Sequence, residues 1–203
     1  MSYHLHETEG IVLRRWPRGE ADMVLRLYTK EYGGVTLLAK GIRLTKSKLR
    51  GAVDLYSRTR VGFIAGKESF RLTHADLVHR YPLLREDAVR YRAVGHIADM
   101  FGRSVADGEG DVELWTLLLE AFSLFSEDAF QEQAMPLYMR SFEIKFLKQL
   151  GYVPETMPRA ALAVVSLPLR DAATALTIHD ADGLMVFLEP LLRYAVTQRW
   201  NEA

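Results

Sequence analysis

The densest group of cations in this 203-residue chain lies between Leu38 and Gly51, a segment without any acidic residue. Its cations are Lys40, Arg43, Lys46, Lys48 and Arg50. A run of like charges repels itself unless a polyanion neutralises it, and lysine and arginine neutralise phosphates and release their counterions. Ile42, Leu44 and Leu49 interrupt the run, so the segment can dock on a hydrophobic core. The sequence therefore predicts a nucleic-acid-binding segment, with a solvated surface loop as the alternative.

Three further arginines, Arg14, Arg15 and Arg26, lie on segments in which apolar and polar residues alternate. We predict that they extend the cationic surface along one face of a sheet. Aromatic residues in the same part of the chain could stack on bases. They are Tyr28, Tyr56, Phe63 and Phe70. Aromatic side chains at alternating strand positions are also common core residues, so both roles stay open.

A second group of cations, Arg140, Lys145 and Lys148, lies on a segment with helical spacing that also carries Phe142 and Phe146. A guanidinium binds a carboxylate through two hydrogen bonds, and a neighbouring apolar groove accepts an aromatic side chain. The segment is therefore either a site for an acidic peptide or an ordinary amphipathic helix with a cationic outer face.

Residues that could perform bond chemistry are sparse. His74 and Asp76 form an H-x-D pair, but no second histidine cluster or carboxylate run accompanies them, so a strand end is favoured over a metal-dependent nuclease. The chain contains no cysteine, which excludes disulfides, thiol catalysis and cysteine-ligated zinc. It has no Walker-type phosphate loop, nucleophile elbow or HExxH motif. We predict no catalytic residue, no cofactor and no bound metal.

The formal net charge of zero conceals a difference between the two parts of the chain. Residues 1–85 hold 16 Lys and Arg against 8 Asp and Glu, whereas residues 86–203 hold 10 against 18. Such an imbalance indicates a basic module that meets a polyanion, joined to a module with another task. No apolar run is long enough to span a bilayer, and the N-terminus lacks the pattern of a secretory signal. We expect no membrane contact and, since cysteine is absent, a location compatible with the reducing cytoplasm.

The elements that must position these residues change character along the chain. The first part alternates with the two-residue period of β-strands. The predicted strands are Gly10–Trp16, Met23–Thr29, Val35–Ala39, Ala52–Ile64 and Ser69–Thr73, the last with an extension toward Leu77. Five short strands with a long connection after the third suit a small closed barrel. An OB barrel, which binds single-stranded nucleic acid, and an SH3-like barrel fit the pattern almost equally.

From Tyr81 onward the apolar residues recur at helical spacing. Helices are predicted over residues 86–106, after an N-cap at Asp111, from Pro136 to a stop at Gly151, and from near Pro190 to Trp200. The pattern of residues 155–182 is mixed, and this region is poorly assigned. The predicted fold class is α+β: a five-stranded OB-like barrel over residues 1–80, followed by a C-terminal helical bundle domain over residues 84–203.

Several motifs occur in a characteristic order: Glu9-Gly-Ile-Val-Leu, Gly19-Glu-Ala-Asp22, Leu27-Tyr-Thr-Lys-Glu-Tyr-Gly-Gly34, Leu38-Ala-Lys-Gly-Ile-Arg43 and Lys46-Ser-Lys-Leu-Arg-Gly51. In this order they resemble the N-terminal domain of the RecO family of bacterial recombination mediators and DNA-annealing proteins. The segment 140–152, which ends in Leu-Gly-Tyr, likewise resembles a helix of that family. The resemblance is good over residues 7–85, moderate over residues 86–154 and poor thereafter.

The resemblance implies an OB fold followed by a helical domain. It implies binding to single- and double-stranded DNA, annealing of complementary strands, and help in loading a recombinase on coated single strands during repair. A cytoplasmic, nucleoid-associated location follows from these roles. The rival hypothesis is an RNA-binding OB-fold protein whose helical domain dimerises.

The resemblance also implies two protein partners, RecR and single-stranded-DNA-binding protein. Arg140 matches the family position that helps to grip the acidic, aromatic C-terminal tail of the latter, with Lys145 and Lys148 on the same helix. On this basis Arg140→Ala is expected to weaken tail binding without affecting folding. Many family members carry a four-cysteine zinc module after Leu-Gly-Tyr. The corresponding region here, from Val153 to about Asp182, has no cysteine, so we expect a variant without the zinc module.

Overall fold

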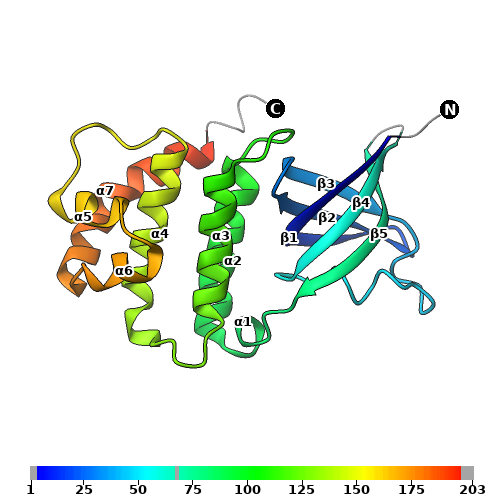
Figure 1. Ribbon diagram of the computed structural model, residues 1–203, viewed down its shortest axis with the longest axis horizontal. Coiled ribbons are helices and arrows are strands. Elements are labelled where there is room, and N and C mark those ends of the chain that lie inside the picture. The colour runs from blue at the N-terminus through cyan, green and yellow to red at the C-terminus, as the bar shows by residue number, and fades with distance from the viewer. Residues whose placement is uncertain (1–3, 67–68, 198–203) are drawn as a thin grey trace. The chain divides into compact units, whose positions relative to one another are not determined.

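A computed structural model describes residues 4–66 and 69–197 of the chain. The strands are β1 (Leu5–Arg18), β2 (Asp22–Thr29), β3 (Gly33–Ala39), β4 (Arg58–Ala65) and β5 (Phe70–His79). The helices are α1 (Leu83–Glu86), α2 (Ala88–Ser104), α3 (Val112–Phe125), the 3-10 turn η1 (Glu132–Ala134), α4 (Met135–Gln149), α5 (Arg159–Val165), α6 (Leu169–Thr174) and α7 (Ile178–Thr197). All strands precede all helices (Figure 1), which confirms the predicted α+β class.

The strands close into a barrel in the order β1-β2-β3-β5-β4. Neighbouring strands are antiparallel except β3 and β5, which pair in parallel through a short register at Leu37 and Leu38. This Greek-key closure of five strands is that of an OB-like barrel, as predicted. The long strand β1 pairs with β4 through its first half and with β2 through its second half, and so joins the two edges.

A bulge interrupts the pairing of β1 with β2 between Val12 and Arg14. An extra residue in one strand breaks the two-residue alternation. As a result Ile11, Val12 and Leu13 are all buried, although the sequence pattern assigns Val12 to the face opposite Ile11 and Leu13. The bulge also marks the point beyond which every residue of β1 is exposed.

The barrel core takes residues from every strand and from the connection between β3 and β4. These core residues are Val12, Leu25, Leu27, Val35, Leu37, Ala39, Ile42, Ala52, Val53, Val61, Phe63, Leu72 and Ala75. Full burial of one such valine, leucine or phenylalanine side chain contributes about 1.5–3 kcal/mol. The predicted fourth strand begins six residues too early. The apolar residues Ala52 and Val53 pack in the barrel core, but they belong to the connection between β3 and β4 and to no strand.

Residues 94–115, which comprise the second part of α2, the loop after it and the start of α3, form one compact unit with the barrel residues up to Pro82. The loop between α2 and α3 is hydrogen-bonded to the β2–β3 hairpin: the amides of Gly34, Gly108 and Gly110 bind the carbonyls of Ala106, Tyr32 and Glu31, each at 3.0 Å. Gly33 has a φ of 59°, and a Cβ there would collide with the Glu109 carbonyl. Only glycine combines this left-handed conformation with so close a backbone approach.

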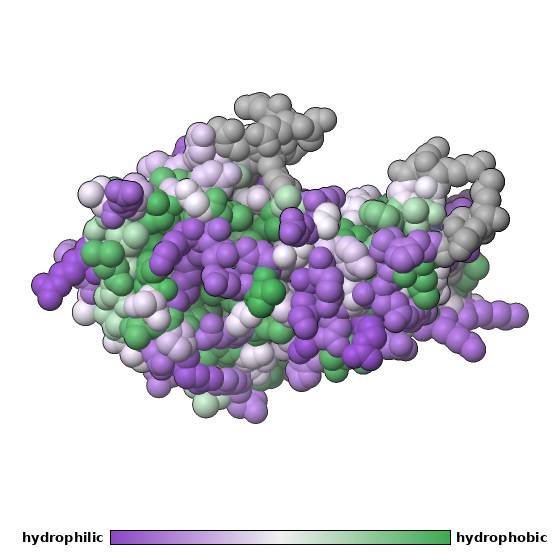
Figure 2. Space-filling view, turned by 45° about the horizontal axis from the view of Figure 1, so that its top comes forward, coloured by the Kyte–Doolittle hydropathy of each residue, from purple (hydrophilic) through white to green (hydrophobic). Residues whose placement is uncertain are grey.

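The second compact unit comprises residues 83–93 and those from Thr116 onward. The unit boundary therefore falls within α2, whereas the sequence pattern separates the domains before it. In this second unit α5, α6 and α7 pack on α4 through a core that includes Ile144, Leu147, Val164, Leu184 and Leu188. The poorly assigned region 155–182 is thus mostly helical and fills an apolar layer. Figure 2 shows hydrophobic side chains interspersed with hydrophilic ones over these helices.

Two of the predicted helix boundaries are confirmed, and a third is wrong. The Asp111 carboxylate accepts the amides of Glu113 and Leu114 at 2.8 and 2.9 Å, and Gly151 follows α4 with a φ of 77°. The prediction that the last helix starts near Pro190 is wrong, since α7 begins at Ile178 and contains Pro190 in its interior. The predicted end at Trp200 lies outside the described residues. Among the described helices, none is both long enough and apolar enough to cross a membrane.

Candidate nucleic-acid interface

The basic loop, residues 40–51, opens the long connection between β3 and β4 and contains neither helix nor strand. It is the light-blue loop at the lower right of the barrel in Figure 1. Ile42 is buried in the barrel core and Leu49 packs against the same core, whereas Leu44 is exposed. Two of the three apolar residues therefore dock the loop as the sequence predicts. Their docking leaves the intervening cationic side chains on the outside.

Polar contacts tie the start of the basic loop to the β1–β2 turn. The Gly41 amide donates to the Asp22 carboxylate at 2.7 Å, and the Arg43 amide donates to the Ala21 carbonyl at 2.9 Å. The Arg43 guanidinium also donates to the Gly19 carbonyl at 3.1 Å. Arg43 thus holds the loop in place while its exposed side chain still carries a positive charge.

The remaining cations of the basic loop point away from the fold. All four are exposed: Lys40, Lys46, Lys48 and Arg50. Across residues 4–66 and 69–197, none of these four side chains forms an ion pair or a hydrogen bond. A folded chain that presents several unneutralised cations on a pinned loop has a surface suited to a polyanion.

Arg14 and Arg15 lie just beyond the β1 bulge, and each belongs to a group in which one aspartate lies between two arginines. The two triads are Arg14–Asp99–Arg103 and Arg15–Asp54–Arg80. The aspartate oxygens lie 3.2 and 2.7 Å from the guanidinium nitrogens in the first triad, and 3.2 and 3.4 Å in the second. Each triad holds two positive charges against one negative charge, so both predicted site arginines lie in positively charged surroundings.

Arg26 occupies a different environment from the other predicted arginines. Its side chain is only 13% exposed and pairs with Asp107 at 2.6 Å, while a second nitrogen donates to the Thr36 hydroxyl at 3.2 Å. These contacts join β2 to the loop between α2 and α3 within one compact unit. Arg26 is therefore committed to holding that loop, and the structure gives it no open cationic surface.

Most of the aromatic residues proposed for stacking belong to the core. Tyr28, Tyr56 and Phe63 are buried, and Phe70 alone among the four is 40% exposed. Sequence inspection overlooked Trp16, which is 43% exposed on β1. The available signal was its position between Arg15 and Arg18, because an aromatic residue interleaved with arginines on one strand is typical of a nucleic-acid surface.

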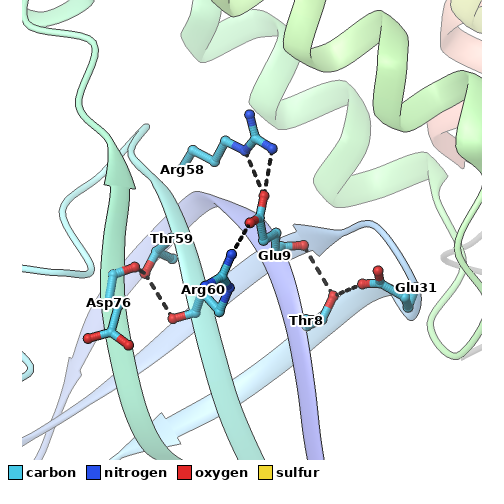
Figure 3. Close-up of polar contacts among 7 residues, drawn as sticks. All are labelled: Thr8, Glu9, Glu31, Arg58, Thr59, Arg60 and Asp76. Atoms are coloured by element: carbon cyan, nitrogen blue, oxygen red, sulfur yellow. Dashed lines mark hydrogen bonds and ion pairs between the residues drawn. The ribbon is translucent and has the colours of Figure 1, made fainter.

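A second concentration of charge lies in a groove beside the start of β1 and β4, where three carboxylates balance three cations. Figure 3 shows Glu9 between two arginines. Its carboxylate accepts from Arg58 at 3.0 and 2.6 Å and from Arg60 at 2.8 Å. The Arg58 guanidinium also lies 5.8 Å from the ring centre of Trp115. We call Glu9, Arg58 and Arg60 the Glu9 cluster.

The electrostatics of the Glu9 cluster confirm how tightly it is paired. Burial raises the pKa of Glu9, but the hydrogen bonds and charges of Arg58 and Arg60 outweigh burial and hold the pKa below its usual value. Next to the cluster, the Thr8 hydroxyl donates to the Glu31 carboxylate, and the other charged residues of the same groove are Glu7 and Lys30. The groove therefore contains cations but offers little free positive charge.

The predicted tail-binding residues on α4 are not equivalent. Arg140 forms an ion pair at 2.6 Å with Glu143, whose side chain is 1% exposed. Lys145 donates to the carbonyls of Val165 and Leu167, and its pKa is lowered by burial. Lys148 is exposed. The structure thus separates them into one cation that neutralises a buried carboxylate, one that fastens the α5–α6 turn, and one that faces solvent.

The arrangement around His74 does not form a metal site. No group of three or more His, Asp and Glu side chains able to hold a metal occurs within the described part of the chain. The His74 ring lies over Gly62 of β4, where any Cβ would collide with it, and one ring nitrogen lies 3.7 Å from Glu7. Asp76 contributes its backbone carbonyl to the Thr59 hydroxyl at 3.0 Å (Figure 3). His74 and Asp76 are therefore residues of strand β5 that contact the neighbouring strand β4.

Two family models match this chain, one over the barrel and one over part of the helical region. Residues 1–81 match the family described as Recombination protein O N terminal, and residues 85–162 match Recombination protein O C terminal. The DNA repair protein RecO of Geobacter metallireducens is 30% identical over 179 residues, which cover 88% of this chain and 70% of that protein. The RecO of Pelotomaculum thermopropionicum is 31% identical over 150 residues, or 74% of this chain and 57% of that protein.

The RecO of Heliobacterium modesticaldum is 31% identical over 153 residues, or 74% of this chain and 53% of that protein. The chain thus spans little more than half the length of several relatives that it matches. The matched regions nevertheless include the barrel, the basic loop and the helices through α4. The order of motifs, the OB-like barrel and these matches agree, and the chain belongs to the RecO family of DNA repair proteins.

Proposed function

We propose that this chain acts in DNA repair as a recombination mediator that binds single- and double-stranded DNA through the basic loop. The observation that carries the proposal is the set of four exposed cations without partners among the described residues, on a loop pinned to an OB-like barrel. Binding would neutralise phosphates and release counterions, a contribution that does not depend on base sequence. The backbone anchors at Gly41 and Arg43 reduce the conformational entropy lost when DNA binds.

Strand annealing follows from the same surface without bond chemistry. Two DNA strands repel each other through their phosphates, and a cationic loop that screens both allows their bases to meet. In the same role the chain would help to load a recombinase on coated single strands. Because DNA is the ligand, we propose a cytoplasmic location associated with the nucleoid.

The partner contacts are proposed from family membership together with the surface of α4. Lys148 and the partly exposed Arg140 would meet the acidic tail of single-stranded-DNA-binding protein, whereas Lys145 supports the site from within the fold. The contact with RecR is proposed on family membership alone.

The test is an annealing assay with complementary oligonucleotides. The variant Lys46→Glu, Lys48→Glu, Arg50→Glu should lose annealing and bind both DNA forms more weakly. The control variant Arg92→Glu, Lys148→Glu, Arg159→Glu changes net charge equally at three exposed cations of the second compact unit, and it should anneal normally. Equal annealing by wild type and the loop variant would contradict the proposal. Displacement of DNA by structured RNA at lower concentration than by competing DNA would instead support the RNA-binding alternative.

A further inference from the structure

An open hollow of about 440 Å³ lies beside the exposed end of β1. It is lined by Leu13, Arg14, Arg15, Trp16, Leu55 and Tyr56. Its volume falls within the range of small-molecule sites. The lining is apolar and aromatic with two cations, a composition that neither the barrel core nor the basic loop shares.

The residues that line the hollow differ in how deeply they are buried. Leu13 is the bulged residue of β1 and is buried, and Tyr56 is held by a hydrogen bond from its amide to the Val12 carbonyl at 2.8 Å. Tyr56 has a φ of 63°, an uncommon conformation for a residue with a side chain. Trp16 remains 43% exposed, although an indole normally gains much from burial. The hollow therefore combines a partly exposed aromatic ring with buried apolar residues beneath the surface.

The two lining arginines, Arg14 and Arg15, directly precede Trp16 on β1, and each belongs to a triad with excess positive charge. The Arg14–Asp99–Arg103 triad and the Arg15–Asp54–Arg80 triad each place two guanidinium groups around one carboxylate. Arg80 in addition donates to the carbonyl of Gly51, the last residue of the basic loop, at 3.0 Å. The second triad therefore adjoins the end of the basic loop, and it links that loop through Asp54 to Arg15, the neighbour of Trp16 in the chain.

We propose that this hollow binds one unpaired nucleobase of single-stranded DNA, stacked on Trp16, with the flanking phosphates close to Arg14 and Arg15. This inference deepens the proposed function and rests on it. Aromatic rings interleaved with cations form the platforms on which single strands stack their bases, because every base has a π-face. In a duplex the base faces are already stacked on one another. The hollow would therefore distinguish single from double strands, whereas the basic loop binds both.

The first test uses the wild-type protein and two single strands with equal numbers of phosphates, an oligothymidylate and an abasic oligonucleotide of the same length. Base stacking should make the oligothymidylate bind about fivefold or more tightly. Trp16→Ala should abolish this preference, Trp16→Phe should keep most of it, and duplex affinity should change by less than about twofold. Tyr194→Ala is the matched control, since Tyr194 is an exposed aromatic residue of the second compact unit, outside the proposed DNA surface.

Several outcomes would overturn the inference while sparing the proposed function. One is a wild-type protein that binds the two single strands equally. Another is a Trp16→Ala variant that keeps the wild-type preference for bases, or that loses single-strand and duplex affinity in equal measure. Failure of the charge-reversed basic loop to lose DNA binding would instead contradict the proposed function. Quenching of Trp16 fluorescence by oligothymidylate, absent in Trp16→Phe, provides a readout that does not depend on the folding of the alanine variant.

Discussion

The basic loop and the Glu9 cluster are both rich in cations and both belong to the barrel unit, yet they differ in what surrounds each cation. In the loop, Lys46, Lys48 and Arg50 have no partner among the described residues. In the cluster, Arg58 and Arg60 share the carboxylate of Glu9 through hydrogen bonds of 2.6 to 3.0 Å. The first arrangement leaves charge for a ligand, and the second uses it for cohesion of the fold.

The difference shows that a count of lysines and arginines does not locate a DNA surface. Both regions contribute to the excess of 16 cations over 8 acidic residues in the first 85 residues. Only the distribution of carboxylates in the folded chain separates free cations from neutralised ones. The predictions below test this separation, from the largest expected effect to the smallest.

The comparison would fail if both regions contributed to salt-dependent binding. Lys46→Ala, Lys48→Ala, Arg50→Ala should lower DNA affinity on the order of a hundredfold at low salt. Removing three phosphate contacts should flatten the log–log salt dependence by about 2 for single strands and about 3 for duplex. Arg58→Gln with Arg60→Gln should leave that slope unchanged. Fluorescence anisotropy across a salt series measures both, and a flattened slope in the arginine variant would contradict the separation.

The second compact unit offers the same contrast on one helix, between Arg140 and Lys148. Arg140→Ala removes the ion-pair partner of the buried Glu143 carboxylate, so the free energy of unfolding should fall by about 2–4 kcal/mol. This outcome replaces the expectation from sequence that the substitution spares folding. Lys148→Ala should change stability by less than about 0.5 kcal/mol, because Lys148 is exposed. Urea denaturation measures both values, and comparable stabilities would show that Arg140 is an ordinary surface charge.

Arg140→Lys is therefore the better variant for a tail-peptide titration. It keeps a positive charge beside Glu143 but loses the two-pronged geometry of the guanidinium. Weaker peptide binding with nearly wild-type stability would support the proposed tail contact. Unchanged peptide affinity would place the contact elsewhere.

The Glu9 cluster should respond in stability where the basic loop responds in affinity. Arg58→Gln removes two charge-assisted hydrogen bonds and should cost about 1.5–3 kcal/mol at neutral pH. Because the pKa of Glu9 is lowered in the folded protein, its contribution is present above the carboxyl pKa of the unfolded chain and is lost as the pH falls below it. The variant should thus lose less stability than wild type between neutral and acidic pH. Equal losses in acid would show that Arg58 is not what lowers the pKa of Glu9.

The smallest predicted effect concerns Tyr28, which belongs to the barrel but faces helical residues of the same unit. Burial raises its pKa to about 12, and its hydroxyl donates to the Asp111 carbonyl at 3.3 Å. An unfolded tyrosine ionises near pH 10, so wild type should lose about 1–2 kcal/mol between pH 10 and 12 through this group. Tyr28→Phe should lack this loss. Parallel alkaline denaturation curves for the two proteins would contradict the prediction.

Sequence reasoning succeeded where one local rule determines the structure. Strand alternation located all five strands approximately, the Asp111 carboxylate caps α3, and Gly151 follows α4 as predicted. Where a tertiary contact decided the outcome, the sequence alone was insufficient. Ala52 is apolar because it packs in the barrel core from a connection, although alternation assigns it to a strand. Trp16 is exposed beyond the β1 bulge, which simple alternation does not predict.

The start of α7 shows a local signal that was present but outweighed. Thr177 and Asp180 cap the helix reciprocally, with the Thr177 amide donating to Asp180 at 2.8 Å and the Asp180 amide donating to the Thr177 hydroxyl at 3.1 Å. Pro190 suggested a later beginning, because proline lacks an amide and usually opens a helix. Packing of Leu184, Leu188 and Ala195 in one core carries the helix through the proline. The role of Arg140 was likewise hidden, since Glu143 shows its burial only in the folded chain.

The hydrogen bonds between the α2–α3 loop and the β2–β3 hairpin have a consequence for how this protein can be divided. A fragment ending at residue 82 would keep every strand but lose Ala106, whose carbonyl accepts the Gly34 amide, and Phe101, whose ring packs edge-on against Tyr28 at 4.7 Å. A fragment ending at residue 82 should therefore be less stable than the whole barrel unit, because residues 94–115, which complete this unit, come from later in the chain. The contacts of these residues with the barrel are long-range in sequence, and such contacts slow folding since their loops must close first. During synthesis, the barrel unit can form all of its contacts only after residues up to about Trp115 have left the ribosome.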